Sequence, residues 1–232
     1  MYVILAIFGV AGLVAVNAVA SHFRKDARAL RAFRKMPQRF ITEFSERESA
    51  KLVGKVSYVG EPLRSPLTGR ECATYSIVIQ SCFEESPEGI GRWSTVIRES
   101  SGQEFSIDDG TGHAIVDPTH AEFGLVTTSM TESGGSNAPT ESEARFLAKH
   151  QRSGGGFHRI RYLEGILQAG DTVAVLARGT TEPDPEGASR QAGYREGPPM
   201  RVRMSGSKKS PVVLSTNVCD WQPRSLPEKS SS

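Results

Sequence analysis

The sequence of 232 residues predicts a mainly β protein: a small β-barrel or sandwich-like domain with one inserted helix, preceded by an N-terminal transmembrane helix. Three observations predict this architecture. The first 20 residues are almost entirely apolar, the segment 21–39 has helical periodicity, and short runs of alternating apolar and polar residues follow between Gly, Asp and Pro turns. Charged residues make up 23% of the chain, which excludes a disordered polyelectrolyte, and three cysteines are too few for a disulfide-stapled scaffold.

The first predicted element is a membrane helix over residues 1–20, where Asn17 is the single polar side chain. About 20 apolar residues are enough to cross a bilayer core of about 30 Å. No Lys or Arg precedes this run, whereas seven occur in residues 21–39, and basic residues stay on the cytoplasmic side. We therefore expect an uncleaved single-pass anchor, with the N-terminus outside and the β-domain cytoplasmic. A cleaved signal peptide is the alternative, because Ala18-Val19-Ala20 has the small-x-small pattern of a cleavage site.

The second predicted element is a basic amphipathic juxtamembrane helix over residues 21–39. Phe23, Ala27, Leu30 and Phe33 fall on one face, and Pro37 ends the helix. Its cations are placed to contact anionic lipid headgroups, although a solvated collar without lipid specificity explains the same charges. The lipid bilayer is thus the expected partner of residues 1–39.

Residues 48–222 form the predicted β-domain, and residues 223–232 a disordered tail. One helix interrupts the strands, because Thr140 and Glu143 form a capping box before the segment ending at Gln151. The segments 129–139 and 180–199 are rich in Gly, Pro, Ser and charge, and we expect loops there. The predicted strands are 52–59, 73–80, 93–97, 105–107, 113–116, 160–167, 172–177, 202–204 and 212–214.

Two strings supply candidate site residues. Ser65–Cys72 is a rigid turn that either presents Arg70 and Glu71 to a partner or, as we favour, only connects strands, with Cys72 as a small buried side chain. Phe105–Gly112 contains the adjacent carboxylates Asp108 and Asp109.

These two carboxylates have competing interpretations. They are compatible with a cation site or an acid–base pair, but a two-residue type I′ hairpin turn at Asp109-Gly110 explains them more simply. That turn requires positive φ at Gly110, and we expect Ile107 and Ile115 on its inward face. Four residues are therefore the candidate partner-binding residues: Arg70, Glu71, Asp108 and Asp109.

No catalytic residue, cofactor or metal site is predicted. The five His and three Cys residues show no metal-ligand spacing, and no nucleophile elbow or phosphate-binding loop occurs. Nucleic acid is not an expected partner. The chain carries +2 overall and residues 21–39 carry +6, so the remainder is net −4, and only two Trp residues are present.

Several strings occur in an order that resembles the GIDE family, whose β-domain is also called the BAM (beside-a-membrane) domain. They are PLRSPLTGRECATYSIVI, Trp93, FSIDDGTGHAIVDP and RIRYLEGILQAGDTVAVLARG, and the resemblance covers about Val53 to Leu214. It implies a membrane-proximal β-domain that binds an unidentified protein partner or substrate. Its best-known relatives are mitochondrial E3 ubiquitin ligases with a C-terminal RING.

This chain has no cysteine after Cys219, so a RING cannot be assembled from it. The family label would be RING-type E3 ubiquitin transferase. An E3 ubiquitin ligase-like activity, the alternative function, would therefore need a separate catalytic partner.

Overall fold

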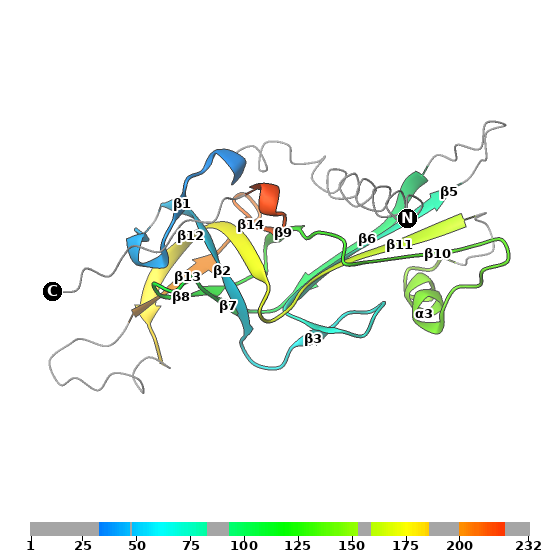
Figure 1. The fold of residues 1–232 in the computed structure, drawn as a ribbon, viewed down its shortest axis with the longest axis horizontal. Helices are drawn as coiled ribbons and strands as arrows, with labels where there is room; N and C mark the ends of the chain where they lie inside the picture. The colour runs from blue at the N-terminus through cyan, green and yellow to red at the C-terminus, as the bar shows by residue number, and fades with distance from the viewer. Residues whose placement is uncertain (1–32, 47, 83–92, 153–158, 186–199, 221–232) are drawn as a thin grey trace, which may run out of the picture.

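The computed structural model describes residues 33–46, 48–82, 93–152, 159–185 and 200–220. They form a β-barrel and a four-stranded sheet that extends from it, so the molecule is elongated (Figure 1). The predicted membrane helix 1–20, most of the juxtamembrane segment 21–39 and the tail 223–232 lie outside the described residues. Among the described helices, none combines the length and apolar character needed to cross a bilayer.

The barrel is a ring of five strands. Its members, in ring order, are β2 (Ser49–Tyr58), β7 (Phe105–Asp108), β8 (His113–Val116), β13 (Met200–Ser205) and β12 (Thr172–Pro183). β12 pairs with β13 on one side and returns to β2 on the other, which closes the ring. All neighbours are antiparallel except β8 and β13, which are parallel. This connectivity is that of a five-stranded Greek-key barrel of the OB type.

Three shorter strands extend the barrel sheet. β14 (Val212–Ser215) pairs with β12, β9 (Ala121–Gly124) pairs in parallel with β14, and β1 (Gln38–Arg39) pairs in parallel with β2. Two 3-10 turns, η2 (Ile41–Glu43) and η5 (Val218–Asp220), follow β1 and β14.

Alternation along the strands fills the barrel interior. Leu52 and Val56 of β2, Ile107 of β7, and Val173 and Val175 of β12 belong to one buried cluster. Successive side chains of a strand point to opposite faces, so the residues between them face outward.

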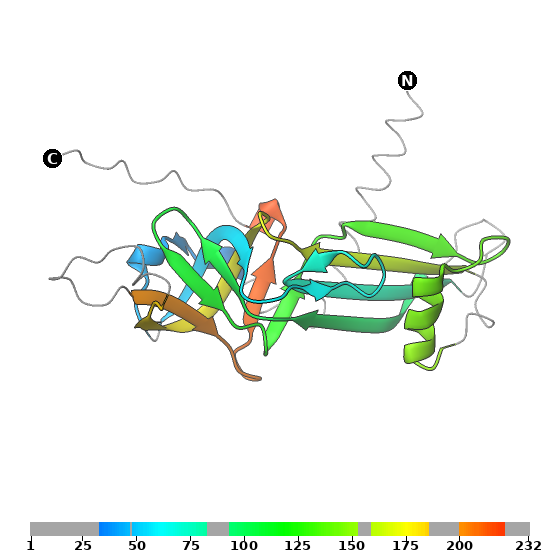
Figure 2. The ribbon, with the colours of Figure 1, turned by 90° about the horizontal axis from the view of Figure 1, so that it is seen from below.

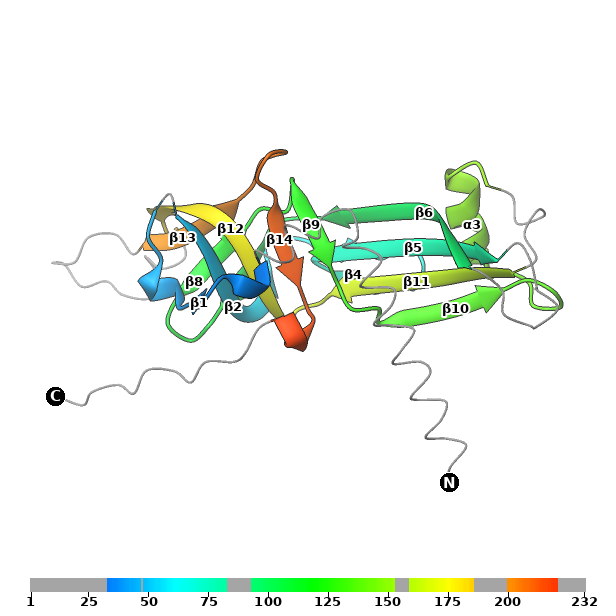
Figure 3. The same ribbon diagram turned by 90° about the horizontal axis from the view of Figure 1, so that it is seen from above.

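The extended sheet has the order β10-β11-β5-β6, which Figure 3 shows most clearly. Its strands are all antiparallel: β10 (Ser129–Ser133), β11 (Arg159–Leu167), β5 (Thr74–Cys82) and β6 (Trp93–Gly102). α3 (Glu141–Lys149) lies at the end of this sheet farthest from the barrel (Figure 2). Phe146 and Leu147 of α3 share a buried cluster with Ile77, Ile79 and Tyr162. A small hairpin of β3 (Leu63–Arg64) and β4 (Glu71–Cys72) contains the predicted turn.

The mainly β prediction and the inserted helix are confirmed, and the domain is barrel-like. Thr140 caps α3, accepting from the backbone of Glu143, whose side chain accepts from the backbone of Thr140. The loop predictions were partly wrong. All five residues of β10 pair with β11 inside the segment 129–139, and β12 runs on to Pro183. β10 is a polar edge strand, and such a strand has no apolar alternation to reveal it.

The C-terminal end of the juxtamembrane segment is fixed to the barrel. Residues 33–35 are helical, and Phe33 is 0% exposed. Its ring packs on the outer face of the barrel with Val53, Ala174, Leu176 and Val213. The ammonium group of Lys51 donates to the backbone oxygen of Phe33 at 3.3 Å. At its C-terminal end, the apolar face predicted for this segment therefore packs against the barrel and not against lipid.

Candidate functional site

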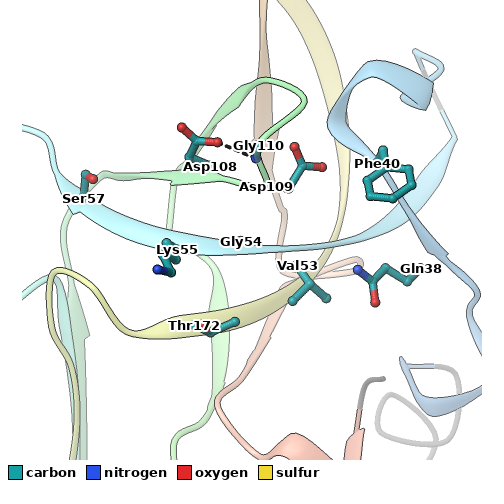
Figure 4. A pocket seen from close by; sticks show the side chains of 10 residues that line it. All are labelled: Gln38, Phe40, Val53, Gly54, Lys55, Ser57, Asp108, Asp109, Gly110 and Thr172. Carbon is teal, nitrogen blue, oxygen red and sulfur yellow. Dashed lines mark hydrogen bonds between the residues drawn. The ribbon is translucent and has the colours of Figure 1, made fainter. Parts of the chain in front are cut away.

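A pocket with a volume of about 660 Å³ opens on the outer face of the barrel (Figure 4). Pockets that bind small ligands have volumes of about 300–1,000 Å³. Four separate segments contribute to it: β1 with the turn after it, β2, the β7–β8 loop and the start of β12. The lining residues are Gln38, Phe40, Val53, Gly54, Lys55, Ser57, Asp108, Asp109, Gly110 and Thr172.

Three side chains of β2 form the floor of the pocket. Val53, Lys55 and Ser57 are two residues apart, so they share the face opposite to the core residues of the strand. The strand register places Lys55 directly between Thr172 of β12 and Asp108 of β7. The pocket therefore includes a row of three side chains, Thr172, Lys55 and Asp108, that runs across three neighbouring strands.

Asp109 has a structural role. One carboxylate oxygen accepts from the backbone N–H of Ile41 at 2.7 Å. The other accepts from the backbone N–H of Thr111 at 2.8 Å, its hydroxyl at 2.7 Å, and the backbone N–H of Gly112 at 3.2 Å. Asp109 thus ties the turn after β1 to the β7–β8 loop, and both of its oxygens are occupied.

Asp108 is engaged more loosely. It accepts from the backbone N–H of Gly110 at 2.6 Å, and its second oxygen lies 3.4 Å from Nδ1 of His113. The side chains of Asp108 and His113 are 46% and 45% exposed, so water screens this pair. The loop sits directly on β2, because a Cβ at Gly54 would lie only 2.8 Å from the backbone oxygen of Asp108.

The loop itself corrects one sequence prediction. Gly110 has φ of +84°, as expected, but a two-residue type I′ turn at Asp109-Gly110 was wrong. Asp108 pairs with His113, which leaves a four-residue loop, and Asp109 does not adopt positive φ. The four hydrogen bonds to Asp109 stabilise this wider turn. Ile107 pairs with Ala114, so Ile115 lies on the other face and not beside Ile107.

Lys55 is the one cation among the residues that line the pocket. Its side chain is exposed, and it makes no ion pair or hydrogen bond with the residues that the structure describes. Within the same ranges, the hydroxyls of Ser57 and Thr172 also make no hydrogen bond. The pocket therefore offers one cation and two hydroxyls beside two carboxylates that already have donors.

The turn Ser65–Cys72 is organised by a residue that the sequence analysis missed. Glu164 on β11 is 1% exposed and accepts from the hydroxyl of Ser65, the hydroxyl of Thr68 at 2.5 Å and the backbone N–H of Leu67 at 3.3 Å. The one signal for it is a Glu inside an apolar strand. Because Glu164 holds Ser65, Leu67 and Thr68 in place, the geometry favours the interpretation as a strand connector.

Arg70 and Glu71 belong to this connector and do not line the pocket. Arg70 donates to Thr68 at 3.2 Å and to Thr128 at 3.1 Å, and Glu71 pairs with Arg64 at 2.7 Å. Cys72 is buried beside them, and burial, followed by the charge of Glu164, raises the pKa of its thiol to about 11. The four candidate residues are thus divided between two places, and only Asp108 and Asp109 reach the pocket.

In the part of the chain that the structure describes, His, Cys, Asp and Glu side chains do not gather in groups of three that could hold a metal ion. Comparison of the chain with protein-family models, with curated proteins and with solved structures finds no match.

Proposed function

We propose that this chain is a membrane-anchored binding module of the GIDE/BAM type, which holds a partner or substrate on the outer face of its barrel. One observation carries the proposal: Lys55 lines the pocket without an ion-pair partner among the described residues, while the carboxylates of Asp108 and Asp109 already accept from backbone N–H groups. Asp109 accepts four hydrogen bonds, so both of its oxygens are already occupied by groups of the fold. The arrangement suits recognition of a charged group.

The anchor would keep this pocket near the membrane. Twelve residues separate the apolar run 1–20 from Phe33, which is buried on the barrel. Twelve residues span at most about 40 Å even when fully extended. The barrel would therefore stand close to the cytoplasmic surface, where its partners would be membrane proteins or proteins recruited to the membrane.

Site-specific photocrosslinking in native membranes tests the binding role. A photoreactive residue at Thr172, which lines the pocket, should give a discrete crosslinked product that Lys55→Gln strongly reduces. The same residue at exposed Ser94, on the extended sheet, is the control and should not give that product. Equal products from both positions, or a Thr172 product that Lys55→Gln leaves unchanged, would contradict the proposal.

Membrane topology is tested separately. If the basic residues after the apolar run hold the β-domain on the cytoplasmic side, protease added to spheroplasts, or to sealed membranes of the same orientation, should leave it intact. A mature protein whose N-terminus maps to Ser21 would show that the apolar run is a cleaved signal peptide and would remove the anchor from the proposal.

A further inference from the structure

We infer that the pocket binds a carboxylate group carried on an apolar body, such as the C-terminal carboxylate of a polypeptide that ends in an apolar residue, or a free hydrophobic acid. The inference rests on the proposed binding function and names the chemistry that the site recognises. It follows from how charge, hydrogen-bond donors and apolar surface are distributed along the pocket.

The polar end of the pocket is complementary to a single negative charge. Lys55 supplies an ammonium group without a partner among the described residues, and Thr172 lies directly opposite it on the neighbouring strand. Directly opposed residues of antiparallel strands have Cβ atoms about 4.5–5.5 Å apart, so one guest oxygen can contact both side chains. Ser57 lies two residues further along the same face of β2, within reach of a second oxygen.

Phosphate fits this pocket less well than carboxylate. Phosphate sites in loops depend on several free backbone N–H groups, and three of the four in the β7–β8 loop already donate to carboxylates of this loop. The N–H of Gly110 donates to Asp108, and those of Thr111 and Gly112 donate to Asp109. Asp108 and Asp109 also line the pocket beside the single cation Lys55, so a dianion would meet more net repulsion there than a monoanion does.

The other end of the pocket has two apolar side chains beside the amide of Gln38 (Figure 4). Val53 and Phe40 line it, on the side of Lys55 away from Ser57 (Figure 4). Both residues are largely buried, so they present a firm wall and not mobile side chains. A ligand that places its carboxylate at Lys55 would lay its apolar group against this wall, and water would be released from both surfaces.

The test is isothermal titration of the full chain in nanodiscs. The probes are N-acetyl-leucine and the tripeptide N-acetyl-Ala-Ala-Leu, each compared with the same molecule capped as its amide. We expect both acids to bind and both amides to bind at least about tenfold more weakly, because the amide removes the charge that Lys55 attracts. Tighter binding of the tripeptide would identify a polypeptide terminus as the source, and equal binding a free acid.

Three variants make the test specific. Lys55→Gln should weaken acid binding about tenfold, whereas Asp108→Asn should strengthen it severalfold, since it removes a repelling charge and keeps an acceptor for Gly110. Lys209→Gln, an exposed lysine outside the pocket, is the matched control and should leave binding unchanged. Melting temperatures should stay within a few degrees for all three variants.

Binding of acid and amide with equal affinity, or an unchanged affinity in Lys55→Gln, would overturn the carboxylate inference. So would weaker binding in Asp108→Asn. If the inference fails while the crosslink from Thr172 still depends on Lys55, the binding function stands and only the ligand class is wrong. Loss of both results would reject the proposed function itself.

Discussion

At the scale of single residues, the two adjacent carboxylates of the β7–β8 loop have different structural roles. Asp109 joins three loop groups to the turn after β1, whereas Asp108 holds one backbone N–H and a half-exposed His113. We expect Asp109→Ala to lower the free energy of unfolding by about 1–3 kcal/mol, because it leaves several donors without an acceptor. Asp108→Ala should cost less than half of this. Urea unfolding of the two variants measures the difference, and equal losses would contradict the assignment.

A second residue-scale prediction concerns Gly110. Its φ of +84° lies in the left-handed region, which residues other than glycine rarely adopt. Gly110→Val should destabilise the barrel by about 1–3 kcal/mol, since a β-branched residue is strained there. Gly110→Asn is the matched control, because Asn tolerates left-handed backbone, and it should cost only a fraction of that. Thermal melts would rank the two variants, and a fully stable Gly110→Val would show that the loop relaxes to another conformation.

At the scale of elements, α3 is attached to the extended sheet by a polar cluster around Glu99 of β6. Glu99 accepts from Tyr75 at 2.8 Å and from Lys149 at 2.8 Å, and it lies 2.9 Å from Nε2 of His150. Burial alone would raise the pKa of Glu99, but the hydrogen bonds from Lys149, Tyr75 and His150 outweigh it and hold the pKa below 4.5. The same contacts act on Tyr75. Burial, and next the hydrogen bond to Glu99, raises the pKa of its hydroxyl to about 12.

This raised pKa predicts how stability depends on alkaline pH. Unfolded tyrosine titrates near pH 10, so the unfolded chain loses this proton first and is favoured as the pH rises. The contribution of Tyr75 is therefore complete below about pH 10 and is lost as the pH approaches 12. Tyr75→Phe should have a slightly lower melting temperature at pH 8 and a shallower decline between pH 10 and 12. Circular-dichroism melts across this range test it, and an unchanged slope would contradict it.

At the scale of the whole molecule, Phe33 connects the N-terminal segment to the barrel wall formed by β2, β12 and β14. We expect Phe33→Ala to lower the free energy of unfolding by about 3 kcal/mol, because it removes a ring that is completely buried. Lys35→Ala, two residues away and exposed, is the control and should change stability by less than about 0.5 kcal/mol. Urea unfolding of the detergent-solubilised chain distinguishes the two, and equal effects would show that this contact does not stabilise the barrel.

Local pattern was enough to predict much of the fold. Strands such as β2, β5 and β12 alternate apolar and polar residues or are rich in β-branched residues. The start of α3 is recognisable from its capping box, Thr140 and Glu143. These signals depend on neighbours a few positions away, so they can be recognised without knowing the fold. Gly110 belongs to the same class, since its positive φ follows from the turn residues around it.

Pairing, burial and the site depended on contacts between distant segments. β10 is polar and became a strand only because β11 offered it an edge. Glu164 looked like one more strand residue, yet its first donor, Ser65, is 99 positions away. The pocket combines residues from Gln38 to Thr172. Lys55 could be recognised as part of a site only from the strand pairing, which places Asp108 and Thr172 on either side of it. Alternation specifies which face of a strand is buried but not which strands meet, because packing and hydrogen bonding of the whole chain select the partners.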